Sequence, residues 1–414
     1  MGQSVVIIGG GIAALTSAYA LANKGHRVTI INQTDTNSAP SFGNAGLLSA
    51  FEKAPLAAPG VITKTLKLML QGKSPIVLRP NLDPHFYRWL VRFMASTTRA
   101  RLKKTLILFE RYGEQSIQAY HRLTQEEGLD FDFHHDGVML VFTEAESYRE
   151  KLRHATDSSK YEVLDYASAK ERLGFVAPNI EGVIHLKRNG RLNPGRLMEQ
   201  LKALLVRKGV CFVSGEEIVD FDVGPKQIKS ARSKTRTYEA DTFILASGHH
   251  TALAAKLGTP LMLIPAKGYN ITFEMEESIK PKQCVMFNDL FIIATPRQHD
   301  MRLTSKLEIG TSNPDINMKR VQSILANLKT HTVKFELQNP RYWAGFRPLT
   351  PNDMPLIGRD STYRNMVYGM GYGWLGMTFG PALGEIIGRL IDEDLENHQS
   401  DDVLLFSGFY QGCL

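Results

Sequence analysis

The sequence predicts a two-domain α/β protein, with a parallel sheet in one domain and an antiparallel sheet in a second, α+β domain. Residues 5–8 form an unbroken β-branched run, which is typical of a central parallel strand buried on both faces. A glycine turn, a helical pattern over 12–22 and a second apolar strand over 27–31 follow directly. The length of 414 residues is too great for one ordinary core.

Local patterns predict the remaining elements in order. Asn193 precedes Pro194, and an N-cap followed by proline at the first helical position predicts a helix start. The other expected elements are helices over much of 61–128, a strand within 131–142, strands at 210–213, 218–223 and 241–246, several strands across 263–310, and a last helix from about 375 to 391.

Cysteine usage and hydropathy exclude several classes of protein. The three cysteines, Cys211, Cys284 and Cys413, are far apart and form no CxxC pair, so no disulfide framework, zinc site or iron–sulfur cluster is expected. His249 and His250 are adjacent, and on an extended chain they point in opposite directions, so we interpret them as loop residues. No signal peptide or apolar run of eighteen residues is present, and a cytoplasmic location is expected.

Positive charge is concentrated in residues 61–111. This segment holds eleven Lys and Arg residues against Asp83 and Glu110, a net +9, whereas the whole chain is +7. A nucleic-acid-binding protein with uniform basic charge is therefore not indicated. Two interpretations stay open. One is a solvated helical face. The other is peripheral contact with the inner face of the cytoplasmic membrane, with apolar side chains entering the lipid interface: Phe86, Trp89, Phe93 and Met94.

The glycine turn matches the dinucleotide fingerprint of Rossmann-type domains, G-x-G-x-x-G/A. Gly9 permits the tight turn, Gly11 lets the backbone approach a pyrophosphate, and Ala14 lets the helix pack closely on the strand. The pyrophosphate charge is expected at the helix N-terminus, beside Ile12 and Ala13. The strand–turn–helix context makes the match much more specific than the glycines alone.

The second strand ends differently from the usual fingerprint. Asp or Glu commonly binds the ribose hydroxyls there, but this chain has Asn32, followed by Gln33. An amide can still donate and accept hydrogen bonds to a ribose diol, without the charge. Asp35 is the alternative carboxylate.

Further segments carry a resemblance to a known family. Residues 41–46 (SFGNAG) resemble the S-x-x-N-A-G loop of bacterial D-amino acid dehydrogenases, and residues 57–61 and 78–80 continue that likeness. Residues 343–358 (WAGFRPLTPNDMPLIG) resemble a block shared by the D-amino acid oxidase and glycine oxidase superfamily. Residues 371–378 resemble the G-H-G-x-x-G block before its last helix, and residues 241–248 resemble its A-D-x-x-V-x-A-x-G strand. The resemblance thus covers nearly the whole chain.

The resemblance implies bound FAD and oxidative deamination of an amino acid, with electrons passing to a quinone or another acceptor. No cysteine falls in the blocks 343–358 and 371–378, so non-covalent FAD is expected. The implied domains are an FAD-binding domain of 1–60, 164–262 and 341–414 and a substrate-binding domain of 61–163 and 263–340. Further cofactor-binding residues are expected from these blocks: Ser41, Asn44, Ala45, Gly46, Leu47, Gly248, Gly373, Trp374, Leu375, Gly376, Met377 and Thr378.

Arg347 is the principal catalytic-site candidate. By resemblance it matches the arginine that clamps the substrate carboxylate, and a planar guanidinium binds a carboxylate bidentately. The alternative is a surface arginine near a proline-rich turn. Tyr269 is a second candidate, for lining the substrate pocket, although a strand tyrosine is more often a packing residue. Tyr372 and Trp374 replace a histidine and a small residue of the family pattern, which reshapes the pocket and leaves the substrate open.

The predicted function is oxidation of a D-amino acid to a 2-oxo acid and ammonia, with hydride transfer to flavin N5. One alternative is a related enzyme acting on a cyclic or secondary amine, such as D-proline, D-hydroxyproline, glycine or sarcosine. The other is a non-catalytic FAD subunit of an electron-transfer complex. Arg347 argues against the second alternative, because a purely structural subunit needs no carboxylate clamp.

Overall fold

The computed structural model describes residues 2–34, 39–50, 55–70 and 74–392. Its first domain is built on a six-stranded sheet of order β19-β20-β13-β1-β2-β9. All neighbouring strands are parallel except β19 and β20. These strands are β1 (Ser4–Ile8), β2 (Arg27–Asn32), β9 (Cys211–Ser214), β13 (Thr242–Leu245), β19 (Leu356–Arg359) and β20 (Met366–Met370).

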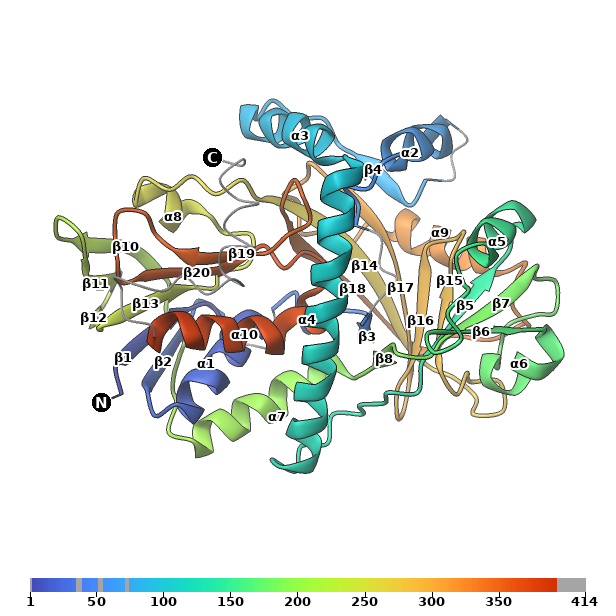
Figure 1. The fold of residues 1–414 in the computed structure, drawn as a ribbon, viewed down its shortest axis with the longest axis horizontal. Coiled ribbons are helices and arrows are strands. Elements are labelled where there is room, and N and C mark those ends of the chain that lie inside the picture. The colour runs from blue at the N-terminus through green and yellow to red at the C-terminus, as the bar shows by residue number, and fades with distance from the viewer. Residues whose placement is uncertain (1, 35–38, 51–54, 71–73, 393–414) are drawn as a thin grey trace.

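Helices cover one face of this sheet, and a small sheet with a short helix covers the other, so its central strands are buried on both faces. Figure 1 shows the helices α1, α7 and α10 together on one side. Their bounds are α1 (Ile12–Asn23), α7 (Pro194–Arg207) and α10 (Gly376–Asp392). The opposite layer consists of β10 (Ile218–Val223), β11 (Ile228–Ser233), β12 (Thr237–Glu239) and α8 (Ala252–Lys256).

Close approach of α1 and α10 depends on glycine. An ideal Cβ at Gly384 would lie 2.6 Å from the backbone of Thr16. The two helices therefore pack backbone against backbone at this point, and a side chain at that position would separate them.

The second domain contains a nine-stranded, mainly antiparallel sheet of order β18-β14-β17-β16-β15-β5-β7-β6, with β4 paired to β17. Its strands are β4 (Ile76–Leu78), β5 (Val138–Phe142), β6 (Tyr161–Leu164), β7 (Gly182–Leu186), β14 (Ile264–Glu274), β15 (Cys284–Phe287), β16 (Ile292–Pro296), β17 (Met301–Ile309) and β18 (Gln338–Leu349). The helices beside it are α5 (Ala145–Leu152), α6 (Tyr166–Leu173) and α9 (Met318–Leu328). A second, buried apolar cluster lies between α9 and this sheet.

Strand pairing corrects two of the expected domain boundaries. The boundary at residue 164 is wrong, because β7 pairs with both β5 and β6 and so extends the second domain's sheet to Leu186. The boundary at residue 341 falls inside β18, which pairs with β14 along its length. Both strands join the second domain through partners distant in the sequence, which local patterns do not reveal.

Three further helices precede β5 in the chain, one before β4 and two after it (Figure 1). They are α2 (Val61–Leu70), α3 (Pro84–Ser96) and α4 (Arg99–Gln125), and α4 runs lengthwise between the domains and packs on α10. Asp83 caps α3 by accepting from the His85 N–H, and Thr98 caps α4. A two-stranded pair, β3 (Leu47–Leu48) with β8 (Gly190–Arg191), completes the fold. Within the described ranges, no helix is both long and apolar enough to cross a bilayer.

Candidate active site

The glycine turn lies at the carboxyl end of β1, beside the end of β13. Gly9 has φ +129°, and a Cβ there would overlap the carbonyl of Ala246. Gly11 is the N-cap of α1 and brings no side chain to the helix terminus, where the Ile12 N–H donates to Ser41 Oγ at 3.1 Å. The turn therefore places the N-terminus of α1 at the carboxyl edge of the parallel sheet, where the fingerprint predicts a dinucleotide pyrophosphate.

Asn32 occupies the position expected for the ribose contact. It is the last residue of β2, and its side chain lies against Gly10, where a Cβ would overlap the amide. Its Nδ2 donates to the carbonyl of Thr34. Gln33 is exposed beside it, and Asp35 lies outside the described residues.

The loop 41–46 joins segments that are hundreds of residues apart. Asn44 Nδ2 donates to the carbonyl of Trp374 at 3.2 Å, and Asn44 Oδ1 accepts from the Gly46 N–H at 2.9 Å. Gly46 has φ +80° and accepts from the Leu192 N–H at 2.9 Å, which leads the chain into β3 at Leu47. Ser41 and Asn44 thus link the N-terminus of α1 to the 371–378 segment.

The 371–378 segment turns the chain from β20 into α10. Gly371 and Gly373 both have positive φ, at +72° and +54°, and the Gly373 N–H donates to the carbonyl of Pro348 at 3.1 Å. Thr378 Oγ1 accepts from the Ser49 N–H at 3.3 Å. The remaining cofactor candidates lie near these segments: Ala13, Ala14, Ala45, Gly248, Leu375, Gly376 and Met377.

Arg347 lies on β18 and faces the same side of the sheet as its cross-strand partner Ala266. Its guanidinium lies over Gly268, where a Cβ would overlap it. The residue is half-buried, yet its guanidinium is desolvated, which lowers the pKa of Arg347 to about 10. Among the described residues, no carboxylate forms an ion pair with it. This cation is therefore available to bind a carboxylate from a ligand.

Tyr269 does not face Arg347. Cross-strand partners share a face, and Tyr269 pairs with Ala344. This pair lies three residues along each strand from Ala266 and Arg347, an odd number, so it is on the opposite face of the sheet. Its hydroxyl donates to Glu308 at 2.7 Å, and burial with that hydrogen bond raises the pKa of Tyr269. The geometry favours the packing interpretation of this tyrosine over the pocket-lining one.

Tyr372 is also enclosed in protein. It is 6% exposed, belongs to the apolar cluster formed by α1, α10 and their sheet, and its hydroxyl lies near Gly369. Burial raises the pKa of Tyr372, and within the described residues its hydroxyl has no hydrogen-bond partner. Tyr372 therefore packs in the apolar core beside the 371–378 turn.

The expectation that the adjacent histidines point in opposite directions is wrong, although both lie in a loop. The rings of His249 and His250 lie 4.1 Å apart, because they follow a turn after Gly248 at φ +66° rather than an extended strand. His249 also contacts the ring of Phe346, and burial together with His250 lowers the pKa of His249 to about 4.

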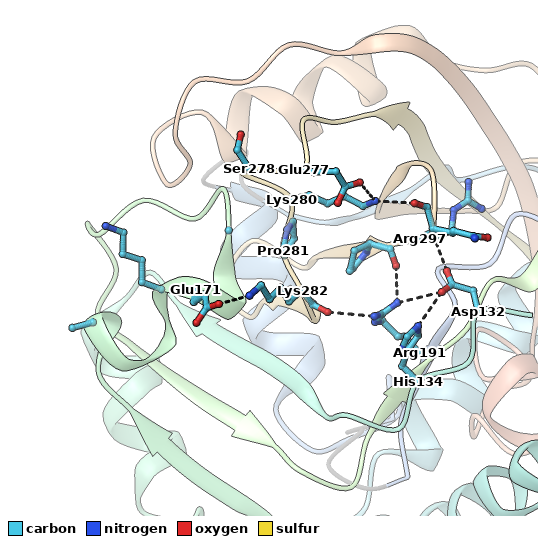
Figure 2. Close-up of a pocket in the computed structure, with 15 residues that line it drawn as sticks. Asp132, His134, Glu171, Arg191, Glu277, Ser278, Lys280, Pro281, Lys282 and Arg297 are labelled. Atoms are coloured by element: carbon cyan, nitrogen blue, oxygen red, sulfur yellow. Dashed lines mark hydrogen bonds and ion pairs between the residues drawn. The ribbon is translucent and has the colours of Figure 1, made fainter.

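A polar cavity of about 830 Å³ lies elsewhere in the second domain (Figure 2). Most of the charged groups that line it are paired within the wall, as Lys280 is with Glu277 at 2.7 Å and Lys282 with Glu171. Arg191 donates to the carbonyl of Pro296 at 3.1 Å. None of the predicted site residues lines this cavity, so it is separate from the candidate site.

Sequence reasoning missed two residues of the second domain that contact the 41–46 loop, Asn270 and Arg302. Both lie at alternate positions of long strands, on the same face as Arg347. Strand alternation places them together, but only the pairing of β14 with β17 and β18 shows which face is which.

The residues present fit a flavin dinucleotide. The glycine turn admits no side chain at Gly9, because a Cβ there would overlap the carbonyl of Ala246. The N–H groups of the first turn of α1 have no acceptor within the helix. Together with the loop 41–46, which connects this turn to the segment at the start of α10, they form the candidate cofactor cradle. These are backbone and amide groups, which suit a pyrophosphate and a polar ring system.

Comparisons with known proteins agree with this geometry. Residues 4–390 match the model of the DAO family, described as FAD dependent oxidoreductase. A D-amino acid dehydrogenase of Helicobacter pylori is 40% identical over 411 residues, covering 99% of this chain and 100% of the relative. One from Methylobacterium nodulans is 29% identical over 404 residues, covering 94% of each.

Solved structures share the fold. Glycine oxidase from Bacillus cereus has a TM-score of 0.72 at 18% identity, covering 96% of this chain and 99% of that one. L-proline dehydrogenase from P. horikoshii has a TM-score of 0.72 at 16% identity, covering 98% of each. With a family match over nearly its whole length, the chain belongs to the FAD-dependent oxidoreductases of the DAO family.

Proposed function

We propose that this FAD-dependent oxidoreductase oxidises a D-amino acid to a 2-oxo acid and ammonia and passes the electrons to a quinone or a similar acceptor. The observation that carries the proposal is Arg347, a desolvated cation that pairs with no carboxylate of the described residues, on the sheet face that also contacts the loop 41–46. The full-length similarity to D-amino acid dehydrogenases supports the substrate class.

Arg347 would bind the substrate carboxylate through two parallel N–H···O hydrogen bonds and so fix the orientation of the Cα–H bond. Gly268 leaves the room in which the guanidinium lies. Bound FAD supplies the two-electron acceptor for the hydride that leaves Cα. The amine must be neutral for that step, and the resulting imine is hydrolysed by water to the 2-oxo acid and ammonia.

The test is anaerobic bleaching of the holoenzyme by a panel of D- and L-amino acids that also includes D-proline, glycine and sarcosine. Bleaching by D-amino acids supports the proposal. Preferential bleaching by the cyclic or secondary amines would reassign the substrate, and a protein that stays yellow with every compound would indicate a non-catalytic FAD subunit.

Removing the guanidinium tests the clamp itself. Arg347→Ala loses a charge-assisted bidentate contact, so KM should rise by about 100-fold while FAD stays bound. Arg347→Lys keeps the charge without the planar fork, so its KM should lie between those of wild type and Arg347→Ala. Unchanged kinetics in Arg347→Ala would remove this residue from the substrate site.

We also propose that α2, α3 and the start of α4 contact an anionic membrane surface, from which a quinone could be reached. These helices gather at one side of the molecule (Figure 1). Phe86 and Trp89, expected in the lipid interface, are instead buried at 4% and 2% exposure, and Trp89 Nε1 donates to the carbonyl of Leu349. The large apolar side chains exposed here are Leu70, Leu82, Tyr87, Val91, Met94, Leu106 and Ile107.

Sedimentation with phosphatidylserine vesicles tests this contact. Binding should be strong at low salt and weaker at high salt, because basic groups attract the lipid headgroups. Val91→Glu with Met94→Glu should abolish it, whereas Val163→Glu, an exposed apolar position on β6, should not. Binding that fails to appear at low salt would overturn the membrane proposal and leave the solvated-face interpretation.

A further inference from the structure

The loop 41–46 is held from the second domain by two side chains of the nine-stranded sheet. Arg302 of β17 donates from one terminal nitrogen to the carbonyls of Phe42 at 3.0 Å and Asn44 at 2.7 Å. Asn270 of β14 donates from Nδ2 to the carbonyl of Gly43 at 2.7 Å. Three consecutive carbonyls of the loop therefore accept hydrogen bonds from the sheet.

Arg302 serves this loop rather than a salt bridge. It is 5% exposed, and burial lowers the pKa of its guanidinium to about 9. Its Nε donates to Thr272 Oγ1 at 3.1 Å, which fixes the plane of the group. The neighbouring carboxylate Asp300 pairs with Arg297 and Arg341 instead.

A buried cation is costly unless its donors are satisfied, and here carbonyl dipoles of the 41–46 loop accept both hydrogen bonds from one terminal nitrogen of Arg302. Displacing the loop would leave the Arg302 donors unpaired in the protein interior. The reverse also holds, because losing Arg302 would leave the carbonyls of Phe42 and Asn44 without these partners. The loop and the arginine therefore stabilise each other's positions.

The position of this loop determines two contacts of the cofactor cradle. Ser41 accepts from the first N–H of α1, and Asn44 donates to the carbonyl of Trp374. Asn270 is 1% exposed and approaches the loop from the neighbouring strand, so the loop has two independent anchors on the sheet. A shift of the loop would disturb both ends of the cradle together.

We propose that Arg302 and Asn270 are positioning residues that hold the loop 41–46, as a flavin-binding loop, on the nine-stranded sheet. They thereby couple cofactor affinity to the geometry around Arg347. They act through the loop backbone. The inference rests on the proposed function for its kinetic arm only, since FAD affinity is measured without any substrate.

The test compares purified holoenzyme variants by the FAD dissociation constant, read from the fluorescence of released FAD, and by the separate effects on kcat and KM. Arg302→Gln should weaken FAD binding by about tenfold or more, since hydrogen bonds from a charged donor are lost. Arg302→Lys keeps the charge and should restore part of the affinity. In both variants kcat should fall more than KM rises, because the carboxylate clamp is intact.

Arg341→Gln is the matched control. Arg341 is one of the two arginines whose charge acts on Arg302, the other being Arg297. It is exposed and donates to Asp300, so its loss should leave FAD affinity unchanged. Equal weakening in Arg341→Gln would attribute the effect to nearby charge and overturn the proposal. FAD affinity within twofold of wild type in Arg302→Gln would also overturn it.

Asn270→Ala keeps the test decisive if Arg302→Gln does not fold. It removes one neutral hydrogen bond to Gly43 and should weaken FAD binding by several-fold. Wild-type affinity in this variant would then contradict the proposal. If D-amino acids fail to bleach the wild-type holoenzyme, the proposed substrate is wrong, but the affinities still decide the role of the two residues.

Discussion

At the scale of single residues, the candidate site depends on a glycine that the sequence does not distinguish from any other strand glycine. Gly268 lies on β14, two residues from Ala266, and its missing Cβ leaves the space that the Arg347 guanidinium fills. Its backbone is not in the left-handed region, so the requirement for glycine is steric and not conformational.

Gly268→Ala should therefore displace the guanidinium without breaking the strand. We expect a rise in KM approaching that of Arg347→Ala, with FAD still bound, measured by steady-state kinetics with an artificial acceptor. Gly224→Ala is the control, since a Cβ there meets only ordinary contacts at 3.5 Å. A Gly268→Ala enzyme with wild-type KM would show that the guanidinium has other room to occupy.

At the scale of elements, α10 contains a proline that α4 compensates. Pro381 lies inside the helix and has no N–H to donate to the carbonyl of Met377, four residues earlier. The hydroxyl of Tyr120 on α4 donates to that carbonyl at 2.6 Å, and Ser116 Oγ accepts from the Ala382 N–H at 3.1 Å. The interrupted helix is thus completed by its neighbour.

Tyr120→Phe should lower the free energy of unfolding by about 1–3 kcal/mol, because the buried carbonyl of Met377 loses this donor while the ring is retained. Urea unfolding measures the change. In a Pro381→Ala background the helix regains its own N–H, so the same substitution should cost less. Equal costs in both backgrounds would show that Tyr120 does not substitute for the missing helical bond.

At the scale of the whole molecule, a buried carboxyl joins the chain just before α2 to the turn between β18 and β19. Asp353, in the turn between β18 and β19, accepts from the Ala57 N–H at 2.9 Å, just before α2. Burial raises the pKa of Asp353 to about 7, although backbone N–H groups of Ala57 and Leu56 act in the opposite direction.

The raised pKa predicts a pH-dependent stability. The folded protein holds this proton more tightly than the unfolded chain between about pH 4 and pH 7, so the contribution of Asp353 to stability falls as pH rises through that interval. Asp353→Asn keeps the acceptor and tolerates the local φ of +58°. The amount by which the melting temperature of this variant exceeds that of wild type should therefore be larger at pH 8 than at pH 5.

Asp360→Asn is the comparison for that experiment. Burial tends to raise the pKa of Asp360, but hydrogen bonds from Tyr368 and Thr259 outweigh it and lower the pKa below its usual value. Its wild-type carboxyl is ionised at both pH values, so this substitution should change the melting temperature equally at pH 5 and pH 8. A constant offset for Asp353→Asn as well would contradict the role given to Asp353.

Local sequence predicted the elements whose signal lies within a few residues. The strand–turn–helix at residues 5–22 required only its own glycines and apolar periodicity, and the helix after Asn193 required only its cap. The prediction that Phe86 and Trp89 are exposed to a lipid interface was wrong for a different reason. Helical spacing shows that α3 has an apolar face, but packing on β14 and β18 decides which aromatic residues it buries.

By itself, the sequence determined the dinucleotide turn, the flavoprotein family and Arg347 as the candidate carboxylate clamp, because each depends on a contiguous pattern. Tertiary structure alone decided that Tyr269 faces away from Arg347, that β7 belongs to the second sheet, and that Arg302 and Asn270 donate to the loop 41–46. The physical reason is strand pairing. A strand's pattern states that its faces differ, whereas register with distant partners selects the face that meets the site.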